Sequence, residues 1–128
     1  MARTSTKPLA FFRHDANSAE DRKIKFLLKR HGMEGYGRWW RLCEILASEQ
    51  DQQLEMQTEE DAEVLADDLM LGSAAEALDF LRDLKSLGLL EMPGDGTVSN
   101  KRMREYGNAV RLKSAVRKRA AETRWKKP

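Results

Sequence analysis

Apolar residues recur at helical spacing in the first third of the chain. Positions i, i+3, i+4 and i+7 are filled by Ile24, Leu27, Leu28 and His31, which predicts one face of a helix. We expect Asn17 or Ser18 to cap this helix, with Glu20 or Asp21 completing a capping box, and Gly32 to end it. The pattern predicts a second helix over about 34–49, whose inward face comprises Tyr36, Trp39, Trp40, Cys43, Leu46 and Ala47.

Shorter elements follow. Residues 51–56 read as a short extended piece. A capping pair, Thr58 with Asp61, opens a helix that ends near Gly72. A second capping pair, Ser73 with Glu76, opens a helix that ends near Gly88. Their apolar positions predict the inward faces of two helices that pack in the core.

The last third predicts a hairpin followed by a helix. Residues 89–92 and 97–100 read as two short strands around the turn at 93–96. A helix is expected from Lys101 to about Arg124, with an apolar face that fades after Val116. No internal repeat is evident.

From the second helix onward, this order is that of a winged helix. The sequence therefore predicts a mainly α fold: a winged helix-turn-helix with an extra N-terminal helix and a long basic C-terminal helix. We expect a winged-helix domain over 11–100 and a basic helix or tail over 101–128. The length of 128 residues suits a single domain.

Composition places the chain in a reducing compartment. The single cysteine, Cys43, excludes an internal disulfide, and its inward position predicts an inert thiol. No stretch reaches the roughly 18 apolar residues that a membrane span needs. We expect a soluble, cytoplasmic protein with no membrane partner.

The net charge of +2 conceals three blocks of opposite sign. Residues 1–43 carry ten Lys or Arg and four Asp or Glu, whereas residues 44–100 carry two and fifteen, and residues 101–128 carry eleven and two. Such segregation indicates a charged partner or a self-assembly interface.

The basic C-terminal block is the strongest candidate binding site. Cations on a helix or tail contact phosphates without reading bases, and such a segment can order on nucleic acid. The alternative is a solvated charge run or a linker to a further domain. With a second patch on the first helix, the candidate nucleic-acid-binding residues are Lys101, Arg102, Arg104, Arg111, Lys113, Arg117, Lys118, Arg119, Arg124, Lys126, Arg22 and Lys23. The first-helix patch also includes Lys25, Lys29 and Arg30, and we expect it to lie beside the C-terminal helix.

The middle block argues against base readout by the usual recognition helix. Its carboxylates would be repelled by phosphates, and the turn at 93–96 carries no cation to clamp them. An acidic face suits a basic protein partner or the basic tail of another copy; the alternative is a face that only confers solubility. The candidate protein-interface residues are Glu59, Glu60, Glu63, Asp67, Asp68, Asp79 and Asp83.

Catalysis has little support. The two histidines, His14 and His31, and one cysteine form no zinc-ligand cluster, and no phosphate-binding glycine loop is present. His31 lies on an apolar stripe, which is typical of a partly buried core histidine. We expect no enzyme activity, no metal, no cofactor and no small-molecule substrate.

Several short motifs carry a family resemblance. They are His14-Asp15-Ala16-Asn17, Asp21-Arg22-Lys23-Ile24, Gly32-Met33-Glu34-Gly35-Tyr36-Gly37, Trp40, and Leu42-Cys43-Glu44-Ile45-Leu46. This string resembles the N-terminal domain of DnaD-like phage and prophage replication proteins of the Lin1244/Lin1753 type, over roughly residues 11–100. Ser18 stands where the family usually has Ala, and Arg38-Trp39 where Ile-Tyr is common.

The resemblance implies a winged-helix fold and a role in replication initiation or helicase-loader recruitment. From the residues alone, the motif favours a packing role over a binding one: glycines let Tyr36 and Trp40 approach the first helix, and His14-Asp15 caps or brackets it. Two functions stay open. One is a DNA-binding replication module, and the other is a protein-interaction or oligomerisation adaptor that uses the acidic helices to recruit a helicase loader or to inhibit a host protein.

Overall fold

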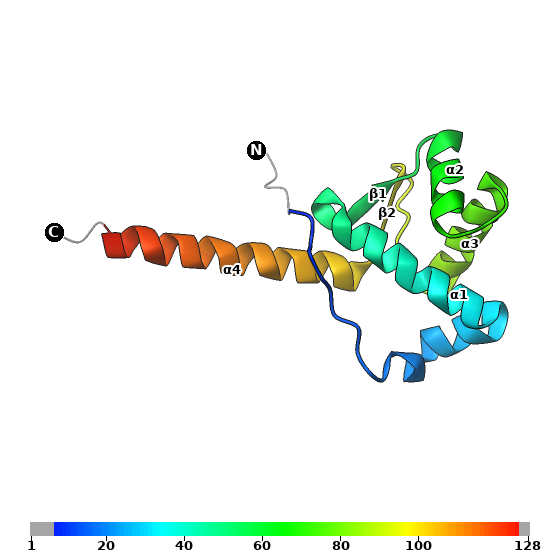
Figure 1. Ribbon diagram of the computed structural model, residues 1–128, viewed down its shortest axis with the longest axis horizontal. Coiled ribbons are helices and arrows are strands. Elements are labelled where there is room, and N and C mark those ends of the chain that lie inside the picture. The colour runs from blue at the N-terminus through cyan, green and yellow to red at the C-terminus, as the bar shows by residue number, and fades with distance from the viewer. Residues whose placement is uncertain (1–6, 126–128) are drawn as a thin grey trace.

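The computed structural model describes residues 7–125 and is mainly helical, as the sequence predicts (Figure 1). Within these residues, four helices and two short strands follow one another: α1 (Arg22–Ser48), β1 (Gln53–Glu55), α2 (Glu59–Asp68), α3 (Ala74–Ser86), β2 (Thr97–Ser99) and α4 (Lys101–Trp125). Short 3-10 turns at Ser18–Glu20 and Gln50–Gln52 flank α1.

The two helices predicted before residue 50 form the two arms of α1, which bends at Gly32. The backbone there has φ 68° and ψ −163°, a conformation that residues with a side chain rarely adopt. The predicted cap was wrong. Asn17 makes no capping side-chain bond, and the Asp21 carboxylate instead accepts the main-chain N–H of Lys23 at 2.9 Å. The chain over 18–20 is a separate 3-10 turn, so α1 begins later than expected.

The strands pair differently from the predicted hairpin. β1 and β2 are antiparallel neighbours, with Leu54 opposite Val98. The segment 89–92 forms only a single bridge, in which Glu91 and Ser99 exchange main-chain hydrogen bonds of 2.8 and 3.0 Å. In this arrangement Val98 is fully buried and belongs to the core.

The core lies where both arms of α1 meet α2, α3 and the sheet. Leu27, Leu42, Leu46, Leu81 and Leu84 are completely inaccessible to solvent. Of the predicted inward face of the second helix, Trp39, Cys43, Leu46 and Ala47 are buried, whereas Tyr36 and Trp40 are half-buried. Leu9 donates a 2.7 Å main-chain hydrogen bond to Ala47, which holds the N-terminal segment beside α1.

The first predicted capping box is confirmed, and the second is present in half. Thr58 accepts the Asp61 N–H at 3.2 Å, and the Asp61 carboxylate accepts the N–H groups of Gln57 and Thr58 at 3.0 Å. Ser73 accepts the Glu76 N–H at 3.2 Å, but the Glu76 carboxylate accepts the Gly72 N–H rather than that of Ser73.

The Asp61 box predicts a pH dependence of folding. Hydrogen bonds from the main chain of Gln57 and Thr58 lower the pKa of Asp61 below its ordinary value of 3.8. Since this pKa is lower in the folded chain, the carboxylate stabilises the fold above the unfolded pKa, and that contribution is lost as the pH falls through the folded pKa. We expect Asp61→Asn to lower the free energy of unfolding at pH 7, and the difference from wild type to shrink below pH 4. Urea titrations at both pH values measure this; a difference that persists at low pH would contradict the carboxylate's role.

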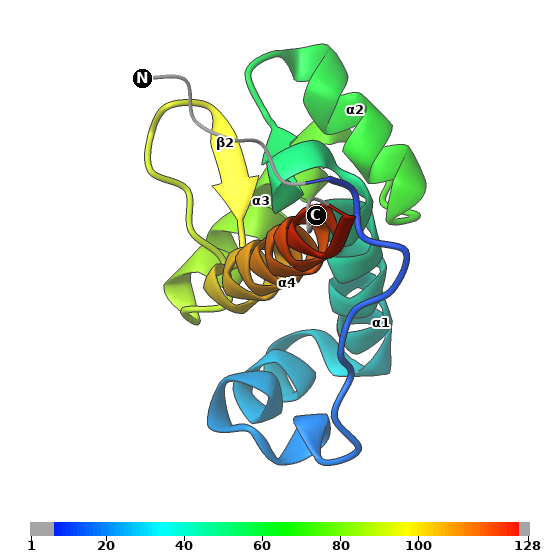
Figure 2. The ribbon, with the colours of Figure 1, turned by 90° about the vertical axis from the view of Figure 1, so that its left-hand side faces the viewer.

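Only the first turns of α4 pack on the body. Met103 and Gly107 are buried, and Arg111 is half-buried. Gly107 lies directly over the buried side chain of Gln52, so a Cβ at this position would overlap the amide oxygen of Gln52. From residue 112 to 124 every residue is exposed, and this length of α4 projects from the domain (Figures 1 and 2).

Candidate nucleic-acid interface

A row of cations follows one side of α4. At 100° per residue, the spacings of 11, 4 and 7 residues bring four basic side chains onto one face, beside the half-buried Tyr106. All four are exposed, and none forms an ion pair with any residue in 7–125. We call this set the α4 stripe; it comprises Arg102, Lys113, Arg117 and Arg124. At 1.5 Å per residue it extends over about 33 Å.

The other predicted cations of α4 lie outside this stripe. Arg104 pairs with Glu91, and the Nε atoms of Arg104 and Arg111 are buried without a hydrogen-bond partner among the described residues. Lys101, Lys118 and Arg119 are exposed on other sides of the helix. Lys126 lies outside the residues that the structure describes. The sequence identified the basic helix correctly but not which cations are already engaged.

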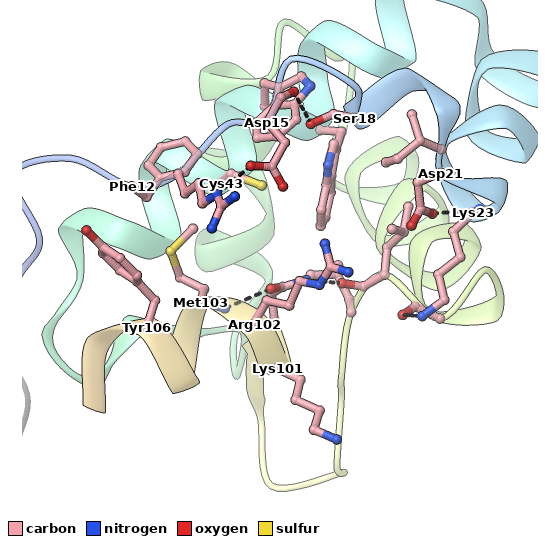
Figure 3. Close-up of a pocket in the computed structure, with 18 of the residues that line it drawn as sticks. Phe12, Asp15, Ser18, Asp21, Lys23, Cys43, Lys101, Arg102, Met103 and Tyr106 are labelled. Carbon is pink, nitrogen blue, oxygen red and sulfur yellow. Dashed lines mark hydrogen bonds and ion pairs between the residues drawn. The ribbon is translucent and has the colours of Figure 1, made fainter. Parts of the chain in front are cut away.

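A groove separates the start of α4 from the N-terminal segment and the first arm of α1 (Figure 3). Its volume is about 880 Å³. Arg13, Lys23, Lys101 and Arg102 line it, so of the predicted first-helix patch Lys23 shares this groove with the start of α4, whereas Arg22, Lys25, Lys29 and Arg30 are not in its lining. The lining also includes four carboxylates, those of Asp15, Glu20, Asp21 and Glu91, which offset its four cations. The groove is thus close to neutral, and the excess positive charge lies along α4.

Most cations of the first arm make contacts within the domain, whereas Lys29 is exposed and forms no ion pair with any residue in 7–125. The guanidinium of Arg22 lies over the ring of Phe26, 5.4 Å from its centroid. Lys25 pairs with Glu20 at 3.2 Å, and Arg30 donates to the Ser86 hydroxyl at 3.2 Å. Lys23 donates to the carbonyl of Gly88 at 3.2 Å. The contacts of Arg30 and Lys23 attach the first arm to the end of α3.

The seven predicted interface acids divide into two groups. Asp79 pairs with Arg82 at 3.0 Å, and Asp83 lies 3.0 Å from His31, so both are engaged within the domain. The five on α2 are exposed and form no ion pair with any described residue; they are Glu59, Glu60, Glu63, Asp67 and Asp68.

Contacts from the first arm of α1 flank α3, the helix that a winged helix would place in the major groove. The ring of His31 stands edge-on to Phe80 at 5.3 Å and reaches Asp83, while Arg30 reaches Ser86. His31 is half-buried, as predicted for a core histidine, but nothing in the sequence indicated that it pairs with Asp83. Because α3 is acidic and is contacted by the first arm of α1, it is poorly suited to base readout.

An aromatic stack at the N-terminal segment was missed from the sequence. His14 lies flat on Trp40, with ring centroids 3.4 Å apart, and Phe12 stacks on the same indole at 6.0 Å. His14 therefore attaches the segment to the second arm of α1 rather than capping the first arm. Asp15 retains a local role, because its carbonyl accepts the N–H and hydroxyl of Ser18. The sequence signal that could have indicated this stack was the presence of two aromatic rings, His14 and Trp40, in the family motif.

Cys43 lines the groove wall but is buried. Burial raises the pKa of its thiol to about 12, and the neighbouring Glu44 adds to the rise. The thiol therefore stays protonated at neutral pH, which disfavours nucleophilic chemistry. Residues 7–125 contain no group of three or more His, Cys, Asp or Glu placed to hold a metal ion. None of the helices in that range is both long and apolar enough to cross a membrane.

A kinked helix, two core helices and a small antiparallel sheet thus define a small, mainly helical domain with a projecting basic helix. Residues 11–92 match the family described as Lin1244/Lin1753-like, N-terminal, and the chain belongs to that family. The match ends before β2, so it does not include α4. No curated protein and no solved structure matches the chain.

Proposed function

We propose that this chain is a winged-helix DNA-binding module of a DnaD-like, phage- or plasmid-type replication initiation protein, and that it grips phosphates through α4 with little base readout. The observation that carries the proposal is the α4 stripe: four exposed, unpaired cations on one face of a helix that projects away from the acidic α2. It has no enzyme activity in this role.

The order of elements supports the winged-helix assignment. From the second arm of α1 onward, the chain runs helix, strand, helix, helix, bridge, loop and strand. Ser99 is opposite Gln53 on one side and bridges Glu91 on the other, so the last strand lies between the other two segments. The loop between Glu91 and Thr97 takes the place of the wing, and its acidic tip suits no phosphate contact.

Charge segregation supports the choice of α4 over α3. α2 and the free end of α4 lie toward opposite ends of the long axis of the molecule (Figure 1). Duplex DNA lying along the α4 stripe is therefore kept away from the carboxylates of α2. Four phosphate contacts release counterions without reading sequence, which gives affinity that falls steeply with salt.

Neutralising the stripe tests the proposal. A variant with Arg102, Lys113, Arg117 and Arg124 all changed to Gln is expected to bind duplex DNA much more weakly than wild type. Four lost phosphate contacts should reduce the slope of log K against log salt by about 3.6, at roughly 0.9 for each contact. Fluorescence anisotropy with a labelled duplex, measured between 50 and 200 mM salt, gives this slope.

A matched variant separates phosphate contact from net charge. Four exposed cations outside both predicted basic patches are changed to Gln, giving the same total charge: Lys7, Arg41, Arg82 and Lys85. This control is expected to retain a slope within one unit of wild type. Equal losses in the two variants would refute the stripe as the interface and would leave only long-range attraction.

A protein-interaction adaptor is the second candidate function. It is favoured by the five exposed carboxylates of α2, none of which is paired within residues 7–125. In this case a basic surface of a replication protein, such as a helicase loader, docks on α2. Binding of that partner would be lost on reversing the charges of α2 and retained on neutralising the α4 stripe.

A further inference from the structure

We propose that a second copy of this chain binds this one, with the Leu112–Val116 face of α4 in one copy packed on α2 around Val64 in the other. This contact goes beyond DNA binding and does not depend on it.

The α4 side of the contact is an apolar strip that no residue in 7–125 covers. Leu112 is 54% exposed and Val116 is 66% exposed, and they lie one helical turn apart. Ala109 and Ala120 continue the same face above and below them, both exposed. Lys113 and Arg119 border the strip. The face is thus apolar in the middle and basic at its edges.

The α2 side has the opposite charge and the same layout. Val64 is 60% exposed. Four carboxylates surround it on the helix: Glu60 lies one turn before Val64, Glu63 lies beside it, and Asp67 and Asp68 lie one turn after it. α2 contains no basic residue. A partner for this face must be apolar at its centre and basic around it, which excludes nucleic acid and anionic lipid surfaces.

The two faces match each other but cannot meet within one chain. α4 projects away from the body, and its free end lies far from α2 along the longest axis of the molecule (Figure 1). Between two copies, the same arrangement brings opposite charges together and covers three exposed apolar side chains. Because the two surfaces differ, the contact either forms twice in a two-fold symmetric pair, with each α4 on the other copy's α2, or continues head to tail to further copies.

The contact has a small apolar centre and an exposed charged rim. We therefore expect weak association that salt disrupts, as for small, transient interfaces. Sedimentation equilibrium of the full chain without DNA should show an average mass that rises with protein concentration at 50 mM salt and returns to that of one chain at 500 mM. A single-chain mass at every concentration would overturn the proposal.

Charge exchange identifies the surfaces. One variant carries Glu60→Lys, Glu63→Lys and Asp67→Lys, and the other carries Lys113→Glu, Arg117→Glu and Arg119→Glu. Each alone has like charges on both faces and should remain monomeric, whereas an equimolar mixture should associate because opposite charges are restored between the copies. A mixture that stays monomeric, or either variant associating alone as wild type does, would overturn the proposal.

An apolar variant separates this contact from DNA binding. Leu112→Ser with Val116→Ser removes the centre of the strip and leaves every cation of the α4 stripe in place. We expect association to be lost and DNA affinity to stay within about twofold of wild type, with an unchanged helical circular dichroism spectrum. Association that survives this change would contradict apolar packing. If the charge-exchanged mixture associates while wild type binds no DNA, the proposed function fails and this inference stands.

Discussion

Replacing Gly35 by alanine is expected to destabilise the fold by about 3 kcal/mol, near the upper end for overpacking of a buried position. Gly35 is buried, and a Cβ there would overlap the Cβ of His31. That atom moves only with the main chain, so no side-chain rotation relieves the overlap. His31 is also fixed by Asp83 and Phe80, which ties the clash to the packing of α1 on α3.

The same substitution at Gly37 serves as the matched control. Gly37 is helical and exposed, and a Cβ there meets nothing within 4 Å. Gly37→Ala should therefore stabilise the domain by up to about 1 kcal/mol, the usual difference in helix propensity. Urea unfolding of both variants measures the two free energies of unfolding. Similar values for the two positions would show that the kink relaxes freely around a Cβ.

Gly32 extends the argument to the bend itself. Its φ of 68° and ψ of −163° fall in a region that is essentially restricted to glycine, although a Cβ there would have open space around it. The penalty for alanine is therefore one of backbone strain rather than collision. Of the three glycines in the Gly-x-x-Gly-x-Gly motif, the structure thus requires glycine at Gly32 and Gly35 but not at Gly37. The expectation that both Gly35 and Gly37 allow close backbone approach was right for Gly35 and wrong for Gly37.

Local signals predicted much of the fold. Helical periodicity located both arms of α1, and the Thr58 side chain with Asp61 marked the start of α2 because a capping box involves only neighbouring residues. Strand pairing was less predictable. Residues 97–99 pair along their length with 53–55 and bridge 89–92 only at Glu91, and pairing with 53–55 depends on contacts between segments distant in sequence.

The candidate site was predictable in composition but not in geometry. Charge blocks in the sequence identified both the basic helix and the acidic face. Pairings such as Arg104 with Glu91, His31 with Asp83 and Arg30 with Ser86 join residues 13 to 56 positions apart. No spacing rule indicates such contacts, and they determine which charges remain available to a partner.

Two truncations are expected to separate folding from DNA binding. A chain ending at Asn100 loses Met103, which is buried in the core, and the Arg104 partner of Glu91. Removing one large buried side chain costs about 2–5 kcal/mol, so this chain should be strongly destabilised. A chain ending at Leu112 keeps Met103, Gly107 and Arg111, and the part of α4 that it loses over 113–124 is exposed throughout. Its free energy of unfolding should stay within about 0.5 kcal/mol of that of the full chain, as for surface changes.

DNA binding should be lost in both truncated chains, but only the longer one attributes the loss to the interface. The chain ending at Leu112 lacks three of the four cations of the α4 stripe while its core remains complete. Thermal unfolding by circular dichroism and anisotropy with a labelled duplex at 50 mM salt provide the two measurements. Wild-type affinity in this chain would place the DNA contact on the body, at the groove beside Lys23, Lys101 and Arg102. Lost affinity with unchanged stability would leave the projecting part of α4 as the phosphate-binding element, because nothing else in the fold would have changed.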